Sequence, residues 1–557
     1  MDINGNMTGK NVVSEALAAS REYETQNEID KNERPLFHVT PPVGWMNDPN
    51  GFSVYNGKVH LFYQYHPYST EWGPMHWGHQ VSDDLIRWEQ LPVAIAPDTI
   101  YDAEGCFSGT AIEKDGEHVL IYTSVMKNPD GDGVLQNQSI AVGDGVTYKK
   151  IQNNPVVTGD MLPEGLSRAD FRDPKAWLED GRYYMAAGCV DQDNKGLVVL
   201  LSSADMESWT FESILARNEG DLGGVWECPD FFKLDDHHVL LVSPTGMKAE
   251  GYEFHNGNNS IYFVGEFDKG EKKFDGGEPL SLDYGTDFYA PQTTLLPDGR
   301  RIMIAWMQSW HNLWIPGGQK WQGMMTIPRE ISLKNGRLIQ KPVREIEKYH
   351  ANMVRYSDEV VSGRRSLEGI SGRSLDVTFV ITGNKYSRFT VNLAKGSGYY
   401  TRFIYDRENN IIEMDRTFAR FEKDVVCIRR ACVKSAECYG DVKGKVDEQQ
   451  EAQDSIKLRF ILDRNSIELF VNDGAMTMST AIYTPIEADG IELLCEGQAV
   501  VDASLFSRKP KYPVQQESNN VSIANTTALI PADKKLLKEI STRQKKRLSL
   551  TKAHHCH

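Results

Sequence analysis

The sequence predicts an all-β protein: a five-bladed β-propeller followed by a C-terminal β-sandwich, with a short N-terminal helix. Three observations indicate this architecture: short apolar runs that repeat about every 60 residues, a second block in which apolar and polar residues alternate, and a narrow apolar stripe near the N-terminus. At 557 residues the chain is too long for one ordinary core, so two or more domains are expected.

The central block, residues 36–345, consists of short apolar runs separated by Asp, Gly, Asn and Pro, a pattern typical of strands joined by tight turns. Its candidate repeat starts are separated by 59, 66, 54 and 60 residues. Each interval has room for four strands, so the five units predict a five-bladed propeller. The repeat starts lie near Asp48, Phe107, Asp173, Glu227 and Asp287.

An internal echo supports this repeat. Ser82–Trp88 shares its pattern of Ser, Asp and Trp with Ser203–Trp209, which follows 121 residues later, close to two repeats. Because the innermost strands of a propeller line its central channel, one residue from each blade can reach a common pocket. The alternative interpretation is a β-sandwich in which acid–proline pairs recur by coincidence.

The second block, residues 346–507, is predicted to be an antiparallel β-sandwich. Apolar and polar residues alternate in Ser374–Ile381 and in Ser455–Asp463, as they do in half-buried strands. Ile467–Val471 and Ile491–Cys495 add further strand-like runs. No run with helical periodicity interrupts them, which favours a sandwich.

The two ends of the chain are expected to lie outside these domains. Residues 1–35 form an N-terminal extension in which Val12–Ile29 is predicted to be a short polar helix on the outside of the propeller. The tail, residues 508–557, holds 11 Lys or Arg against 3 Asp or Glu. We favour a mobile basic tail over a docking amphipathic helix at Asp533–Arg547.

The N-terminus lacks the basic and apolar regions of a secretory signal, and no run of about 18 apolar residues occurs, so no spanning helix is expected. The eight cysteines are scattered without paired CxxC spacing, which favours reduced thiols. We therefore expect a cytoplasmic protein. Its net charge of −17 argues against nucleic acid and anionic membranes as principal partners.

Three short motifs each place an acidic residue one or two positions before a proline, among aromatic residues. They are Trp45–Gly51 (WMNDPNG), Phe171–Pro174 (FRDP) and Trp226–Asp230 (WECPD). In this order they resemble the signature of glycoside hydrolase family 32, which contains invertases and sucrose-6-phosphate hydrolases. The resemblance covers residues 36–507, and Asp463–Gly474 is similar to the family's C-terminal sandwich, whose usual role is structural support.

The resemblance implies retaining hydrolysis with two carboxylates about 5–5.5 Å apart. By resemblance, Asp48 is the nucleophile, and Glu227 is the acid that protonates the departing oxygen and later acts as base. Asp173 is the third carboxylate, which in the family holds the hydroxyls at C3 and C4 of the fructosyl ring. A charged hydrogen bond that strengthens as the ring flattens stabilises the transition state.

The two catalytic roles require different pKa values, so the surroundings of the two carboxyls should differ. Asn47 and Asn50 are expected to donate hydrogen bonds that keep Asp48 ionised. Next to Glu227, an apolar setting is expected to raise the pKa of the acid, and it is supplied by Val225, Trp226 and Cys228.

Other residues match family positions around the fructose subsite. Arg172 is expected to orient Asp173 or to contact the sugar, whereas an isolated Arg–Asp pair would more often be a structural salt bridge. Each of the aromatic candidates could equally belong to the propeller core. The candidate substrate-binding residues are Asn47, Gln64, Trp72, Phe107, Ser108, Arg172, Tyr289 and Trp306.

The leading functional hypothesis is a retaining β-fructofuranosidase that acts on sucrose, sucrose 6-phosphate or short β-fructans. No cofactor or metal is expected, because no cluster has metal-ligand spacing and this hydrolysis requires none. The alternatives are a fructosyltransferase of the same fold and a catalytically silent carbohydrate-binding protein. No phosphate-binding motif distinguishes sucrose 6-phosphate from sucrose, and the oligomeric state stays open.

Overall fold

The computed structural model describes residues 14–30, 34–311, 313, 315–420, 426–433 and 455–508. Residues 1–13 of the N-terminal extension lie outside the described residues. The same is true of the basic tail beyond residue 508, including the helix considered at residues 533–547. Within the described ranges, no helix is both long enough and apolar enough to cross a membrane.

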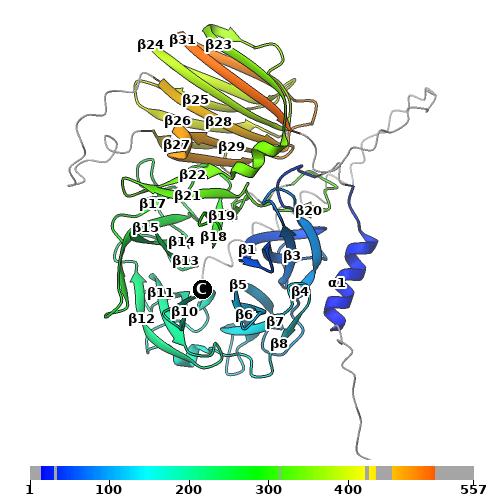
Figure 1. The fold of residues 1–557 in the computed structure, drawn as a ribbon, viewed down its shortest axis with the longest axis vertical. Helices are drawn as coiled ribbons and strands as arrows, with labels where there is room; N and C mark the ends of the chain where they lie inside the picture. Colours follow the sequence, from blue (N-terminus) through cyan, green and yellow to red (C-terminus); the bar gives the residue numbers. More distant parts are fainter. Residues whose placement is uncertain are drawn as a thin grey trace, which may run out of the picture. The chain divides into compact units, whose positions relative to one another are not determined.

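Antiparallel sheets form the predicted five-bladed propeller in the described part of the chain, and Figure 1 shows them arranged around a common centre. The first strands of successive blades contact one another and form the innermost layer. Four predicted repeat starts lie within these first strands, and the fifth, Asp287, lies two residues before one. Short β20 (Trp321–Gln322), which follows the second strand of blade 5, pairs with the first strand of blade 1.

The strands of the blades follow the order of the chain. Blade 1 contains β1 (Gly44–Tyr55), β2 (Lys58–His66), β3 (His76–Ser82) and β4 (Glu89–Ile95), and blade 2 contains β5 (Gly105–Lys114), β6 (Glu117–Lys127), β7 (Val134–Gly143) and β8 (Tyr148–Lys150). Blade 3 contains β9 (Arg172–Glu179), β10 (Arg182–Val190), β11 (Gly196–Ser203) and β12 (Trp209–Arg217). Blade 4 contains β13 (Trp226–Leu234), β14 (His237–Pro244), β15 (Ile261–Asp268), β16 (Lys273–Asp275) and β17 (Leu280–Ser281). Blade 5 contains β18 (Tyr289–Leu295), β19 (Arg301–Trp306), β21 (Arg329–Lys334) and β22 (Arg337–Pro342).

The internal echo of the sequence forms the same turn in blades 1 and 3, between the third and fourth strands. In each copy the aspartate, Asp84 or Asp205, accepts hydrogen bonds from two following backbone N–H groups at 2.7–3.0 Å. The tryptophan that ends each copy donates its indole N–H to the carbonyl oxygen three residues earlier. The repeated sequence therefore forms the same turn in both blades, and in each blade the aspartate side chain stabilises it.

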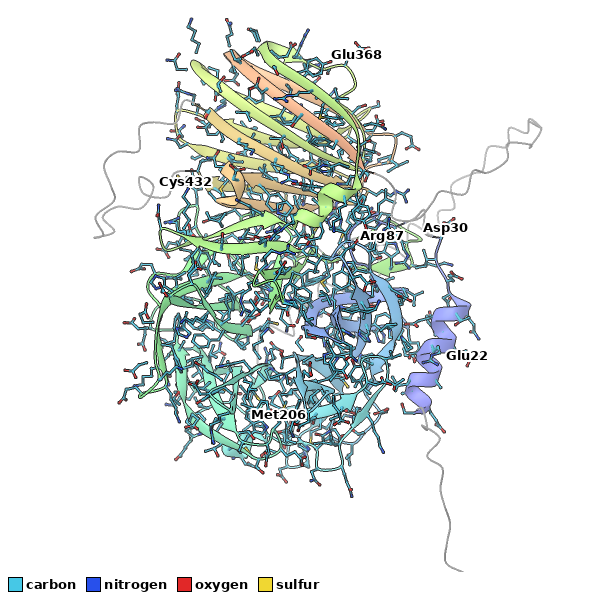
Figure 2. The ribbon with its side chains drawn as sticks, viewed as in Figure 1. Glu22, Asp30, Arg87, Met206, Glu368 and Cys432 are labelled. Carbon is cyan, nitrogen blue, oxygen red and sulfur yellow. The ribbon has the colours of Figure 1, made fainter. Side chains whose placement is uncertain are left out.

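A short N-terminal helix, α1 (Glu15–Gln26), lies within the span expected for it. The hydroxyl of Ser14 accepts the backbone N–H of Leu17 at 3.3 Å and so caps the first turn. Leu17 and Tyr23 pack against a core cluster that includes the strands of blade 1, whereas Glu22 on α1 is exposed (Figure 2). The helix therefore docks on the propeller through one face.

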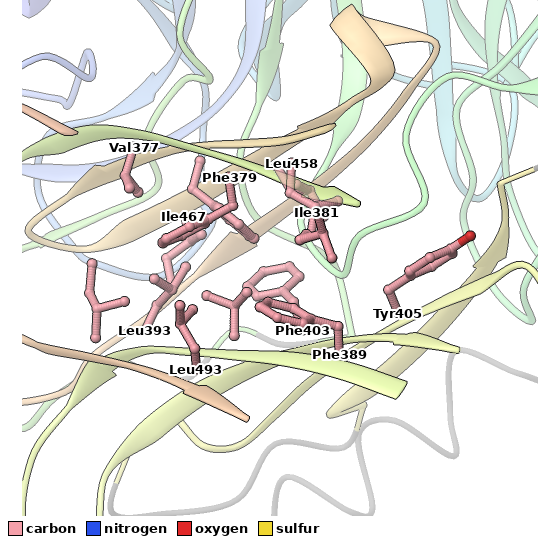
Figure 3. Close-up of a cluster of buried hydrophobic side chains, with 14 of the residues drawn as sticks. Val377, Phe379, Ile381, Phe389, Leu393, Phe403, Tyr405, Leu458, Ile467 and Leu493 are labelled. Atoms are coloured by element: carbon pink, nitrogen blue, oxygen red, sulfur yellow. The ribbon is translucent and has the colours of Figure 1, made fainter. Parts of the chain in front are cut away.

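The described residues after blade 5 form the predicted sandwich, although their strands are hydrogen-bonded into one continuous sheet. One long strand, β24 (Leu375–Lys395), takes part in both layers of the sandwich. Its first part pairs with β28 (Ser455–Asp463) and its later part with β25 (Tyr400–Asp406). Figure 3 shows Phe379 and Leu458 facing Phe389 and Phe403 across the core. The strands are β23 (His350–Arg365), β24 (Leu375–Lys395), β25 (Tyr400–Asp406), β26 (Ile411–Phe418), β27 (Ile428–Cys432), β28 (Ser455–Asp463), β29 (Ser466–Val471), β30 (Met476–Ala481) and β31 (Gly490–Arg508). Three 3₁₀-helices among the described residues are η2 (Gly159–Met161), η3 (Arg344–Tyr349) and η4 (Asn472–Gly474).

Among the residues that the structure describes, the cysteines agree with the expected reduced state except for Cys432. Cys432 is disulfide-bonded, so the expectation of reduced thiols throughout is wrong there. The free cysteines among the described residues are Cys106, Cys189, Cys228, Cys427 and Cys495.

Buried ion pairs join the propeller to the sandwich. Arg329 on β21 donates to Glu468 at 2.6 Å and to Asp283 at 3.1 Å, and all three side chains are almost inaccessible to solvent. His38 lies between Asp463, at 2.9 Å, and the same Glu468, at 3.0 Å. The family-like string that contains Asp463 and Glu468 thus supplies the carboxylates that hold the two parts together.

His38 is expected to make the stability of this junction pH-dependent. Burial lowers the pKa of His38, but the hydrogen bonds and charges of Asp463 and Glu468 outweigh it and raise the pKa to about 8. This stabilisation is complete below pH 6.5 and is lost as the pH rises through 8, which amounts to about 2 kcal/mol. Chemical unfolding of the wild type and of His38→Gln at pH 6 and pH 9 measures it.

The difference between the two proteins should be large at pH 6 and smaller at pH 9. His237→Gln is the matched control, because His237 makes its ion pair with Glu266 at the exposed surface. An equal effect of His38→Gln at both pH values would contradict the prediction.

Candidate active site

The candidate site lies near the start of the innermost strands, at a β-bulge in each of them. In the first strand of every blade, the register with the second strand shifts next to a candidate residue. A bulge bends the strand and re-aims a side chain, and proline is tolerated there because the ladder hydrogen bond is already lost. This geometry accounts for the recurrence of acidic residues just before Pro49, Pro174 and Pro229.

Three residues at these bulges have left-handed backbone conformations. Asp173, Cys228 and Ala290 have φ angles of 63°, 49° and 51°, and each immediately precedes a proline. Such a conformation costs a non-glycine residue about 1–2 kcal/mol. Blades 3, 4 and 5 thus each hold one strained residue at the point where the first strand turns toward the channel.

Asp48, on β1, is held from the neighbouring blade. The Ser108 hydroxyl on β5 donates a hydrogen bond to Asp48 Oδ2 at 2.8 Å, and the Cys228 thiol lies 3.5 Å from the same oxygen. The indole N–H of Trp45 donates to Asn47 Oδ1 at 2.7 Å, which fixes the amide beside Asp48. The nucleophile candidate is thus oriented by fixed groups rather than by solvent.

Asp173, on β9, and Asp48 both contact the same residue, Cys228. The backbone N–H of Cys228 donates to Asp173 Oδ2 at 2.9 Å, and the Cys228 thiol lies 3.6 Å from that oxygen. The backbone N–H of Asp173 donates to the Thr123 hydroxyl at 2.9 Å. One cysteine therefore contacts both aspartates, although they are 125 residues apart in the sequence.

Glu227, on β13, is surrounded by polar groups rather than by the apolar side chains that the sequence suggested. Arg172 donates to Glu227 Oε1 at 3.1 and 3.2 Å, and the Tyr289 hydroxyl donates to Oε2 at 2.6 Å. Trp226 points to the other face of the strand, where it packs with Phe263. Because side chains alternate along a strand, Glu227 points into the channel and its neighbour Trp226 points away from the channel.

The three carboxylates cannot all carry their charge without cost. Burial and the charge of Glu227 raise the pKa of Asp48, although Ser108, Asn47 and Cys228 lower it. Burial, together with Glu227 and Asp48, raises the pKa of Asp173 to about 7 in spite of Arg172. Near neutral pH the two buried aspartates therefore resist carrying full charge at the same time.

The remaining candidates differ in exposure. Gln64 is buried and donates to the carbonyl oxygen of Cys106 at 2.9 Å. Trp72 is 49% exposed, and its ring meets that of Phe107 edge to face at a centroid distance of 5.9 Å. Trp306 is fully buried against Trp45, so it forms the wall of the site from behind.

Several residues at the site were not singled out from the sequence. Cys228 was expected only to be an apolar neighbour of Glu227, whereas its N–H and thiol contact the two aspartates. Asp170 and Gln136 accept hydrogen bonds from Arg172 at 2.9 and 3.2 Å and so fix the guanidinium group. Gln136 comes from blade 2, and nothing in its local sequence indicates this role.

Replacement of Asp173 by asparagine is expected to stabilise the free protein while it impairs catalysis. The raised pKa means that ionised Asp173 destabilises the fold: its contribution is favourable at low pH and is lost as the pH rises through about 7. Asparagine can still accept the N–H of Cys228. We expect a gain of about 1–3 kcal/mol at pH 8 and a smaller gain at pH 5.

Thermal unfolding at both pH values measures this gain, and Asp180→Asn, at an exposed ion pair with Lys269, is the control. A lower melting temperature of Asp173→Asn at pH 8 would contradict the prediction.

Models of known protein families match both domains of the chain. The model of the glycosyl hydrolases family 32 N-terminal domain matches residues 38–342, and that of the family 32 C-terminal domain matches residues 345–507. The first match covers the propeller with its three carboxylates, and the second covers the sandwich.

Individual proteins agree with these matches. Sucrose-6-phosphate hydrolase of Escherichia coli is 35% identical over 489 residues, which cover 86% of this chain and 96% of that protein. Raffinose invertase of Escherichia coli is 36% identical and covers 85% and 94%. The solved structure of a β-fructofuranosidase from Bombyx mori superposes with a TM-score of 0.75 at 30% identity, and covers 90% of this chain and 99% of that one. Sequence, fold and site thus agree that the chain belongs to glycosyl hydrolases family 32.

Proposed function

We propose that the protein is a retaining β-fructofuranosidase that hydrolyses the fructosyl bond of sucrose, sucrose 6-phosphate or short β-fructans. The observation that carries this proposal is the arrangement of three carboxylates around Cys228, with Arg172 and Tyr289 bound to Glu227. Retaining hydrolysis needs one carboxylate free to attack and one carboxyl positioned to give and take a proton.

In the first step, Asp48 attacks the anomeric carbon of the fructosyl unit while Glu227 gives its proton to the departing oxygen. The bond to the leaving sugar breaks, and an ester between Asp48 and the fructosyl carbon forms. In the second step, Glu227 takes a proton from water, whose oxygen attacks the same carbon and releases Asp48. Two inversions at one carbon give fructose with retained configuration.

We propose that Asp173 stabilises the charge that develops on the sugar ring and that Arg172 orients Glu227. Asp173 accepts hydrogen bonds from the ring hydroxyls, and these strengthen as positive charge develops at the ring. Arg172 donates two hydrogen bonds to Glu227 Oε1, so it holds the carboxylate of that residue in place for the second step. Ser108 and Asn47 orient Asp48, and Gln64, Trp72, Phe107, Tyr289 and Trp306 complete the proposed binding site.

Relatives support the substrate range and its cellular context. Some are named sucrose-6-phosphate hydrolases, one is a raffinose invertase, and a levanase from Bacillus subtilis is 33% identical. A variant of the Bombyx mori enzyme has been solved in complex with sucrose. Because a phosphorylated sugar is an intracellular substrate, a role in the cytoplasm follows from the sucrose 6-phosphate alternative.

The test is to incubate the purified protein with sucrose, sucrose 6-phosphate and a short inulin oligomer, beside an Asp48→Asn control. Release of fructose that collapses in the control supports the proposal, and the fastest substrate identifies the class. Glucose release with little free fructose, and products longer than the substrate, would instead indicate fructosyl transfer. No turnover by the folded protein would overturn the proposal in favour of a carbohydrate-binding role.

A further inference from the structure

The loop between β2 and β3, residues 67–75, connects the N-terminal helix with the candidate substrate site. One end of the loop carries Tyr68 and the other carries Trp72, and both rings are partly exposed, at 41% and 49%. Each touches a different part of the molecule. Contacts at both ends therefore decide where the loop lies.

At the first end, α1 packs on the loop through two aromatic rings. Tyr23 meets Tyr68 edge to face at a centroid distance of 5.2 Å, a favourable geometry for aromatic pairs. Glu24, the next residue of α1, is inserted beside Tyr65 on β2, and burial raises its pKa to about 7. The helix is thus seated on blade 1 at the point where the loop begins.

Two imidazole rings carry the contact through the loop. The Tyr68 ring lies edge-on to His66 and to His76, at 5.8 Å in each case. Nδ1 of His66 and of His76 lies 3.4 and 3.1 Å from the carbonyl oxygen of Pro74. Burial lowers the pKa of both histidines, that of His76 to about 4, so both rings are neutral at pH 7 and can donate to this oxygen.

Of these two histidines, His66 also packs against the turn beside Trp72. A β-carbon added to Gly73 would lie 2.7 Å from Nε2 of His66, so the imidazole packs directly on the backbone of Gly73. From this turn the Trp72 ring reaches Phe107, and the next residue, Ser108, donates to Asp48. A continuous path therefore joins Tyr23 to the site, through side-chain contacts, the backbone of Gly73 and the adjacent residues Phe107 and Ser108.

We propose that α1 positions Trp72 for the sugar substrate through Tyr23, Tyr68 and the loop of residues 67–75. Tyr23 and Tyr68 are positioning residues, because they act through Trp72 rather than on the reacting atoms. The inference rests on the proposed function, in which Trp72 contacts the sugar. It predicts that loss of the Tyr23–Tyr68 contact weakens substrate binding more than it slows the chemical step.

The structural part of the inference is tested without substrate. Amide hydrogen exchange in residues 67–75 should increase in Tyr23→Ala relative to the wild type, because the loop loses its support from α1. Glu22→Ala is the matched control: it changes the neighbouring, exposed position of the same helix and should leave this segment unchanged. Unchanged exchange in Tyr23→Ala would overturn the coupling between α1 and the loop, whether or not the protein is an enzyme.

The functional part is tested by a double-mutant cycle on the substrate with the highest turnover. Tyr23→Ala should raise KM about 3- to 10-fold and leave kcat within about twofold. In a Trp72→Ala background the same change should have almost no effect, because the group that it positions is gone. Additive effects on KM, or an unchanged KM in Tyr23→Ala, would overturn the inference, whereas an inactive wild type would overturn the proposed function.

Discussion

Replacement of Asp48 by asparagine is expected to lower kcat for sucrose or its analogues by about 10⁴-fold or more, with the fold intact. The amide has the size of the carboxylate but cannot form the ester intermediate, and loss of a nucleophile typically costs this much. The Ser108 hydroxyl still has an oxygen to which it can donate at this position. Initial rates of fructose release, measured on the purified variant, determine the effect.

The stability of this variant separates a chemical effect from a folding defect. Burial and the nearby charge of Glu227 raise the pKa of Asp48, so a neutral side chain removes a repulsion, and the melting temperature at pH 8 should stay equal or rise. Asp83→Asn is the control, because Asp83 lies in an exposed pair with Lys58 and should affect neither quantity. A variant that retains a tenth of the wild-type kcat would exclude Asp48 as the nucleophile.

The blades were predictable because their signals are local. The repeat interval requires only four strands and their turns, and the turn at Asp84 recurs at Asp205 because the same short-range hydrogen bonds form in both blades. The three acid–proline motifs were recognisable for a related reason, although the roles of their carboxylates came from the resemblance to glycoside hydrolase family 32. A bulge followed by proline is a property of a few adjacent residues, so it leaves a readable motif.

The contacts between blades were not predictable in this way. The expected apolar setting of Glu227 came from its neighbours in the sequence, yet strand alternation sends Trp226 to the opposite face and brings Arg172 and Tyr289 from other blades. The role of Gln136 toward Arg172 has the same origin. Such partners are set by how the sheets pack, and no local pattern in one sequence records that packing.

The second large effect is expected when Glu227 is replaced, and its size should depend on the leaving group of the substrate. Glu227→Gln is expected to lower kcat/KM for sucrose by about 10³-fold or more, because glutamine cannot protonate the departing oxygen. In fructosyl fluoride the leaving group is the fluoride ion, which departs without being protonated. Formation of the fructosyl-enzyme from this substrate should therefore be nearly unaffected. The amide keeps an oxygen that can accept from Arg172, which limits the structural disturbance.

The second half-reaction then identifies the same residue as the base. With fructosyl fluoride, the variant should release one equivalent of fluoride in a burst and turn over slowly, because no group takes the proton of the attacking water. Azide is a nucleophile that needs no such base, so it should restore turnover and give a fructosyl azide of retained configuration. Glu266→Gln, at an exposed pair with His237, is the control. Equal losses on sucrose and on the fluoride, without rescue by azide, would mean that Glu227 supports the site rather than moving the proton, and the acid would have to be sought elsewhere around Cys228.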